Sequence, residues 1–187
     1  MLAESRTMAP DQAERNWAML AHLTALLTVG VGLSTGGLGM VFALLVPLAM
    51  YLYFAGRSRY VAFHALQATV FQALGALAYV GVAALAGAAI ATAWVVVGVL
   101  SLLLVGFLLL PVALGLTLLG GLEVALGPII WLGFALRGAF LTYHGEDFEY
   151  PGIGRLVARS MQLPPAPSSQ ASAGQAPPGV DALKTVS

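Results

Sequence analysis

Residues 17–55, WAMLAHLTALLTVGVGLSTGGLGMVFALLVPLAMYLYFA, decide the fold because they contain no aspartate, glutamate, lysine or arginine. A helix needs about 20 apolar residues to cross a bilayer, so this stretch is long enough for two crossings. The sequence STGG at residues 34–37 divides it as a tight polar turn. We therefore expect a first crossing over residues 17–33 and a second over 38–55, with Pro47 as a kink.

The composition of the whole chain agrees with this interpretation. Of its 187 residues, 59% are hydrophobic and 9% charged, and the mean hydropathy is +0.90. A soluble domain carries about 25% charged residues. This composition excludes a water-soluble enzyme, and the zero net charge leaves no basic surface for nucleic acid. The partner that the composition predicts is the lipid bilayer.

The number of crossings depends on the stretch from residue 60 to 143, where three apolar blocks (61–86, 93–119 and 122–143) have only Glu123 as a charge before residue 137. Three more crossings would give five in all and would place four basic residues on each side. With four crossings all eight basic residues lie on one side of the membrane. This agrees with the preference of basic residues in short loops for the cytoplasmic side. We therefore predict four crossings, with five as the alternative, both termini cytoplasmic and a location in the inner (plasma) membrane. One block must then lie along the interface, re-enter, or merge with a neighbour into a long tilted helix, and the start of the first block is the candidate for the interface.

The predicted fold class is an all-α, polytopic membrane helix bundle with an additional interfacial segment. It divides into a polar N-terminal segment (1–15), a transmembrane helical domain (16–145), a membrane-surface segment (146–162) and a disordered Pro/Ala/Ser tail (163–187). Pro10 and Asp11 favour a helix start. Residues 150–161 are expected to form a short amphipathic helix. Its inward side chains would be Ile153, Leu156 and Val157, and its outward ones Arg155 and Arg159.

A polar stripe is the most distinctive pattern: His64, Gln67 and Gln72 lie within about 140° of arc on a helix. Two interpretations stay open. In the first, the stripe marks an interfacial segment or forms hydrogen bonds with a neighbouring span, because polar side chains in lipid need partners. In the second, the stripe lines a polar groove or pathway.

Two other polar residues lie within apolar segments. Glu123 follows Gly120-Gly121 and is either at a helix N-terminus, in a buried pair with a histidine or Arg137, or in a proton- or ion-handling role. Trp17 is expected to anchor the first helix at the membrane interface, so His22 would lie about a turn and a half deeper in the membrane. We expect His22 to form a hydrogen bond with a neighbouring polar group.

Small residues recur between residues 75 and 91, and the pairs Ala84/Ala88 and Gly87/Ala91 have the spacing of closely packed helices. Pro111 and Gly127-Pro128 predict kinks or breaks in the later helices. The chain has no cysteine and no catalytic motif, so we assign no catalytic residue, no cofactor and no metal site.

Three blocks together resemble a known group: residues 14–23 (ERNWAMLAHL), residues 59–72 (RYVAFHALQATVFQ) and residues 145–155 (GEDFEYPGIGR). The chain resembles a large bacterial family of small multi-spanning membrane proteins of unknown function, itself distantly similar to the twenty-kilodalton subunit of the chloroplast inner-envelope protein translocon. The resemblance implies a four-helix membrane domain with cytoplasmic termini and supplies no enzymatic activity. The apolar stretch after Gln72 departs from a compact four-span layout. The positions that the resemblance marks are Trp17, His22, His64, Gln67, Gln72, Phe148, Tyr150, Pro151 and Arg155.

Two functions follow as hypotheses. The first is a non-enzymatic scaffold or accessory subunit of a membrane complex, with a membrane-protein partner or a homo-oligomer. The alternative is a translocon-like component or small channel with a polar path near His64, Gln67 and Glu123. An intramembrane enzyme is disfavoured because no site is visible.

Overall fold

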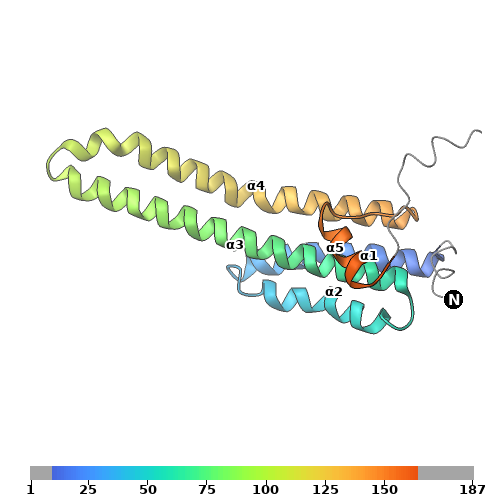
Figure 1. Cartoon of the computed structure of the whole chain (residues 1–187). Coiled ribbons are helices and arrows are strands. Elements are labelled where there is room, and N and C mark those ends of the chain that lie inside the picture. Colours follow the sequence, from blue (N-terminus) through green and yellow to red (C-terminus); the bar gives the residue numbers. More distant parts are fainter. Residues whose placement is uncertain (1–9, 164–187) are drawn as a thin grey trace, which may run out of the picture.

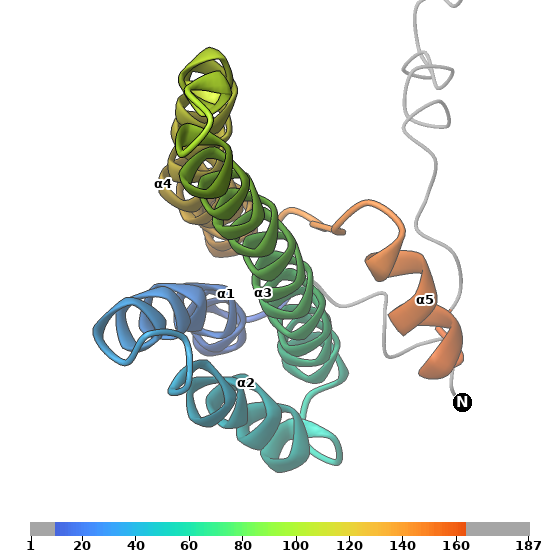
Figure 2. The same ribbon diagram turned by 90° about the vertical axis from the view of Figure 1, so that its left-hand side faces the viewer.

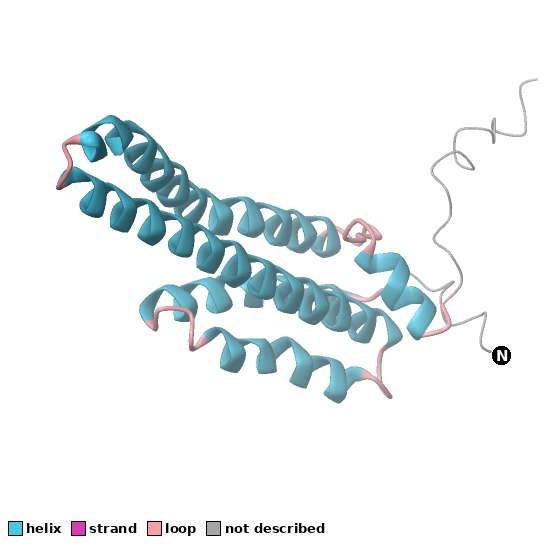
Figure 3. Cartoon of the chain, turned by 60° about the vertical axis from the view of Figure 1, so that its left-hand side comes forward, coloured by secondary structure: helices cyan, strands magenta, loops and turns pink. Residues whose placement is uncertain are grey.

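The structure is a computed structural model, and it describes residues 10–163. These residues form a helical bundle without strands (Figure 3), which confirms the all-α membrane helix fold. The helices follow one another as an antiparallel pair, a long hairpin and a short final helix (Figure 1). They are α1 (Gln12–Ser34), α2 (Met40–Phe54), α3 (Arg59–Ser101), the 3₁₀ turn η2 (Val105–Leu109), α4 (Leu110–Tyr143) and α5 (Ile153–Ser160). The predictions for residues 1–9 and for the tail from residue 164 lie outside the described residues.

The ends of α1 follow from local sequence. Asp11 is the N-cap, accepting a hydrogen bond from the N–H of Glu14, whose carboxylate in turn accepts one from the N–H of Asp11. The helix ends where Gly36 takes a positive φ of 61°, and the N–H of Gly37 donates to the carbonyl of Gly32 at 2.7 Å. The turn expected at residues 34–37 is therefore confirmed.

The three apolar blocks after residue 60 merge into two long helices. α3 has 43 residues and α4 has 34, and the chain reverses between them at residues 102–109. Gly120-Gly121 does not interrupt α4, which corrects the expected separation there. Hydrocarbon offers a broken helix no alternative hydrogen-bond partners, so a glycine pair that would end a helix in water is tolerated.

The prolines of α4 leave it continuous as well. Pro111 lies in the first turn, where its missing N–H costs nothing, and Pro128 lies inside the helix. Because Pro128 has no N–H, it leaves the carbonyl of Val124 without its helical donor, and the hydroxyl of Tyr79 donates to that carbonyl at 3.2 Å. The break expected at Gly127-Pro128 does not occur, since a neighbouring side chain replaces the lost bond.

The helices differ greatly in length. α1, α3 and the η2–α4 segment are each long and apolar enough to cross a membrane, whereas α2 has only 15 residues. At 1.5 Å per residue α3 is about 65 Å long and α2 about 22 Å. α1 and α2 therefore lie against only one half of the α3–α4 hairpin, and the closed end of the hairpin projects beyond them (Figure 1).

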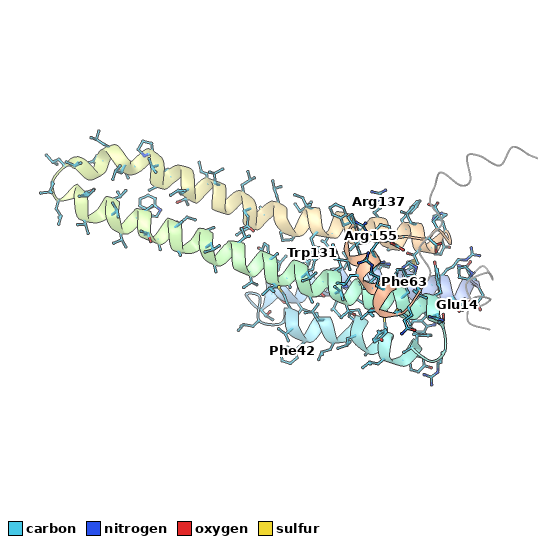
Figure 4. All side chains as sticks on the ribbon, in the orientation of Figure 1. Glu14, Phe42, Phe63, Trp131, Arg137 and Arg155 are labelled. Carbon is cyan, nitrogen blue, oxygen red and sulfur yellow. The ribbon has the colours of Figure 1, made fainter. Side chains whose placement is uncertain are left out.

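Charged side chains gather at the open end of the hairpin. Figure 4 shows Glu14, Arg137 and Arg155 in this half of the molecule. α5 packs its buried Val157 and Ala158 against Phe63 of α3. Figure 2 shows it on the side of α3 away from α1 and α2. The short helix predicted near residues 150–161 is confirmed as a helix, but Leu156, expected inward, is 60% exposed.

The start of α3 is not an interfacial segment, which corrects the prediction for the start of the first apolar block (61–86). Val61, Ala62 and Ala65 are fully buried, as are the polar residues of the stripe. The reason is that α1, α2, α5 and the chain between α4 and α5 surround this part of α3. The core of the molecule therefore lies where the sequence suggested contact with the membrane surface.

Candidate functional site

A cluster of buried polar side chains lies near the open end of the hairpin. We define the polar cluster as His22 of α1, His64 and Gln67 of α3, and Tyr150 of the chain between α4 and α5. None is more than 2% exposed. The structure thus brings together three predicted site residues and one residue that the family resemblance marked.

The two histidines and the tyrosine form a chain of hydrogen bonds. Nδ1 of His22 lies 3.1 Å from the hydroxyl of Tyr150, and Nε2 of His22 lies 3.2 Å from Nδ1 of His64. Two facing imidazole nitrogens form a hydrogen bond only when one carries a proton and the other does not. Both nitrogens of His22 therefore have partners, which confirms the expectation that it bonds neighbouring polar groups.

Gln67 binds the main chain of the segment between α4 and α5. Its Nε2 donates to the carbonyl of Phe148 at 3.1 Å, and its Oε1 accepts from the N–H of Tyr150 at 2.9 Å. The side-chain amide thus satisfies two buried backbone groups of a segment that has no secondary structure of its own. One residue of α3 thereby fixes the position of this segment.

The ring of Tyr150 is held from two sides. It stacks on Phe71 of α3, with centroids 3.9 Å apart and planes 3° from parallel. Phe148 contacts its edge, with centroids 4.8 Å apart. Burial raises the pKa of the Tyr150 hydroxyl. The hydroxyl therefore stays protonated at physiological pH and remains a neutral hydrogen-bond partner.

A second group of polar residues lies next to the polar cluster along α1 and α3. Thr28 donates to Oε1 of Gln72 at 2.7 Å, and Nε2 of Gln72 donates to Thr24 at 2.7 Å. The amide of Gln72 is thus satisfied by two hydroxyls one helical turn apart on α1. The polar stripe of α3 bonds neighbouring elements, as the first of its two interpretations held.

A glycine permits the close approach of α4 to this site. A Cβ atom at Gly138 would lie 2.7 Å from Cε1 of Phe148 and 3.1 Å from Nδ1 of His22. Any side chain at this position would displace the aromatic ring or the imidazole. Gly138 therefore belongs to the site although it offers no functional group.

Polar contacts also fix the surroundings of the cluster. Ser58 donates to Glu14 at 2.7 Å, which joins the start of α3 to the start of α1. Arg59 donates to the carbonyl of Met161 at 3.0 Å, which holds the chain after α5. The segment from residue 146 to 163 is therefore attached to α3 at both of its ends.

The other predicted residues lie elsewhere. Trp17 is 45% exposed and packs on Phe54, while Pro151 and Arg155 are exposed. Glu123 lies in the middle of α4, which corrects its expected place at a helix N-terminus. Nor is it paired: within the described residues its Oε2 is buried without a hydrogen-bond partner.

Sequence reasoning missed Thr24, Thr28 and Gly138. A signal existed for the two threonines, because hydroxyls four residues apart on an apolar helix share a face. No signal marked Gly138 among the 22 glycines of the chain. Its role depends on Phe148, which reaches it only in the folded molecule.

The chemistry available here is that of a hydrogen-bonded connection. The cluster joins α1, α3 and the segment after α4 through neutral side chains. Residues 10–163 contain no group of three or more His, Cys, Asp or Glu side chains placed to hold a metal ion. The arrangement holds the segment after α4 in place against α1 and α3.

Comparison with known proteins identifies the family. No curated protein and no solved structure matches the chain. A family model described as the magnetosome magnetite crystal formation protein family (MamF/MmsF) matches residues 13–157, which include all the helices except the first residue of α1 and the last three residues of α5. This bears out a bacterial family of small membrane proteins, whereas the similarity to the translocon subunit stays a prediction. The match covers most of the sequence, and the chain belongs to the magnetosome magnetite crystal formation protein family.

Proposed function

We propose that this chain is a non-enzymatic accessory protein of the magnetosome or inner membrane, with both termini cytoplasmic, and that it serves magnetite crystal formation as a scaffold. The family to which the chain belongs is named for magnetite crystal formation. The scaffold function supposes that the chain assembles with copies of itself or with other membrane proteins. Three features support it.

The first feature is a face of α3 composed of small residues. On the far half of α3, where most side chains are exposed, six exposed residues follow one another at alternating steps of three and four, which is the spacing of helix pairs with a crossing angle near 20°. We call this face the small-residue face. It consists of Gly81, Ala84, Ala88, Ala91, Val95 and Gly98.

The small-residue face is the observation that carries the proposal. Its members lie on the side of α3 opposite Ala86 and Ile90, whose side chains approach Gly120 of α4. A Cβ at Gly81 or at Gly98 would meet no atom within 4 Å. Small side chains let a second helix approach closely in a membrane, where packing rather than water exclusion drives association.

The second feature is the enclosure of the polar residues. His22 bonds Tyr150 and His64. Gln72 bonds two threonines, and Gln67 bonds the main chain. A channel needs polar groups that line a water-filled path. Enclosed and satisfied groups favour a structural role for them.

The third feature is the attached segment 146–163. Because Gln67 and Arg59 hold it on α3, it presents α5 at the end of the molecule where the arginines gather. Arg155 and Arg159 of α5 are exposed. This places a charged surface beside the membrane-embedded helices, where a partner outside the lipid can bind.

Single-cysteine crosslinking tests the proposal, because the chain has no cysteine of its own. Ala88→Cys places a thiol on the small-residue face, and Ala89→Cys places one on an exposed neighbouring face of the same helix turn. Under oxidation in native membranes, Ala88→Cys should give at least five times more disulfide-linked dimer than Ala89→Cys. A chain that stays monomeric and unaccompanied, both under crosslinking and after mild solubilisation, would contradict the scaffold.

The alternative is a translocon-like component or small channel. The observation that favours it is a carboxylate oxygen of Glu123 in α4 that is buried and has no hydrogen-bond partner in the described part of the chain. Purified protein in liposomes should then conduct ions, and Glu123→Gln should reduce the conductance at least tenfold. Liposomes without conductance would remove this function and leave the scaffold untouched.

A further inference from the structure

A cleft opens where the α1–α2 pair ends beside the hairpin. It has a volume of about 420 Å³ and lies between the last turn of α1, the α1–α2 turn, α3 and α4. Trp131 of α4 borders it at the end nearer the core, where it packs with Val29 and Met40. Its walls include Gly36, Ala84 and Val124.

Helix length explains why the cleft lies at this depth. α2 is about 22 Å long, less than the hydrocarbon thickness of about 30 Å, whereas α3 is about 65 Å long. With a tilt of 40°, the upper end of the observed range, α3 still extends about 50 Å along the membrane normal. The exposed side chains of the hairpin beyond the α1–α2 turn are apolar, for example Leu85, Val99 and Leu118, so the hairpin continues through lipid and the cleft faces lipid there.

The lining is apolar because its polar groups are already bonded. The hydroxyl of Tyr79 donates to the carbonyl of Val124, and the hydroxyl of Thr35 in the adjacent turn donates to the carbonyl of Val31. The indole nitrogen of Trp131 has no acceptor among residues 10–163, but it is turned toward α3, where a Cβ at Gly75 would lie 2.8 Å from it. What remains for a ligand is hydrocarbon surface.

The size of the cleft excludes a helix as its occupant. Three turns of helix, about 16 Å long and about 10 Å across, fill roughly 1,300 Å³. The whole empty space of the cleft, with its open side included, is about 970 Å³, which is less than such a helix needs. A helix of a second copy or of another protein can cover the opening but cannot enter, whereas an extended hydrocarbon chain can.

The sequence does not favour the rest of this chain as the occupant. The described residues begin before α1 and end after α5, at the end of the bundle remote from the α1–α2 turn (Figure 1). The sequence after residue 163, PPAPSSQASAGQAPPGVDALKTVS, is too rich in polar residues and proline to match an apolar lining. Lipid is the component that surrounds the cleft on its open side.

We propose that this cleft binds one acyl chain of a bilayer phospholipid, inserted from the leaflet on the side of the hairpin tip, between the α1–α2 turn and the α3–α4 hairpin. The bound chain replaces the packing that a longer α1–α2 pair would provide. It thereby supports the hairpin where α1 and α2 leave it. This site is distinct from the small-residue face, although Ala84 borders both.

Fluorescence quenching of Trp131 tests the site. The background variant Trp17→Phe/Trp94→Phe keeps Trp131 as the sole tryptophan, and it is reconstituted in vesicles of phosphatidylcholine with bromine on one acyl chain. Trp131 is only 9% exposed, so strong quenching requires a brominated chain in the cleft. Ala84→Phe fills the cleft and should lower quenching at least threefold.

A matched control separates the site from general effects. Ala88→Phe lies one turn further along the same face and does not line the cleft, so quenching should stay within 1.3-fold of the background value. Both substitutions disturb the small-residue face, so loss of self-association would affect them equally. Equal quenching in the background, Ala84→Phe and Ala88→Phe proteins would overturn the proposal.

A second pair of variants tests the site independently, in case Ala84→Phe fails to fold. Val124→Phe fills the cleft from α4, and Val112→Phe is its exposed control outside the cleft. Photoreactive phosphatidylcholine with a diazirine on its acyl chain should label residues near 128–131 in the wild type and in Val112→Phe, and at least fivefold less in Val124→Phe. Labelling spread evenly along the hairpin in all three proteins would contradict a specific site.

Discussion

The side-chain amide of Gln67 accepts a hydrogen bond of 2.9 Å from the main-chain N–H of Tyr150, 83 residues away along the sequence. Its Nε2 donates to the carbonyl of Phe148. A glutamine inside a membrane helix thus takes the place of a neighbouring β-strand for a short extended segment. Phe148 and Tyr150 need this partner, because the carbonyl of one and the N–H of the other would otherwise be buried without a hydrogen bond.

Replacing Gln67 should therefore release this segment. Gln67→Leu leaves a carbonyl and an N–H buried without partners, at a cost of about 1–3 kcal/mol each. Trypsin should then cut at Arg155 and Arg159 at least tenfold faster in nanodiscs. Gln12→Leu, at the exposed start of α1, is the control and should leave the cleavage rate unchanged. Equal protection of both variants would show that the apolar contacts of α5 suffice.

Tyr150 predicts a dependence of stability on high pH. Burial raises the pKa of its hydroxyl in the folded state, so this group stabilises the fold fully below pH 10. As the pH rises above 10, the unfolded state ionises while the folded state holds its proton. The stabilisation is then lost by about 1.4 kcal/mol per pH unit.

The comparison with Tyr150→Phe isolates this effect. The variant loses a hydrogen bond to His22 and should be about 1 kcal/mol less stable at pH 8. Between pH 10 and 11 its melting temperature in detergent should fall less than that of the wild type. Parallel curves over this interval would mean that Tyr150 does not hold its proton more tightly in the folded state.

Much of this fold could be predicted from composition and periodicity. The first two helices and the turn between them follow from a 39-residue stretch without charge. The short helix near the end follows from alternating arginines and apolar residues. These elements depend on neighbours close in the sequence, which a single sequence records.

The later helices and the site depended on contacts that a sequence does not record. Gly120-Gly121 and Pro128 are helix breakers in water, but lipid and the hydroxyl of Tyr79 keep α4 intact. The resemblance marked His22 and Tyr150 as important, but nothing in their types showed that they touch across 128 residues. The polar stripe on α3 was evident, whereas its enclosure came from elements that follow much later in the chain.

Gly138 should tolerate no side chain. Gly138→Ala would place its Cβ within 3.1 Å of both Phe148 and His22. Because both rings lie in a packed cluster, the overpacking should cost about 1–3 kcal/mol in unfolding free energy. Gly133→Ala, on the same helix with nothing within 4 Å, should leave stability unchanged or raise it slightly. Thermal unfolding in detergent compares the two, and equal melting temperatures would count against a close contact at Gly138.

Removing the carboxylate of Glu123 should stabilise the protein. Its Oε2 is buried, and none of the residues that the structure describes gives it a hydrogen bond; a buried polar group in this state costs about 1–3 kcal/mol. Glu123→Leu should therefore raise the melting temperature in nanodiscs, whereas Glu146→Leu, at an exposed position, should change it little. A lower melting temperature for Glu123→Leu would mean that the carboxylate has a partner in the membrane, which would favour the channel over the scaffold.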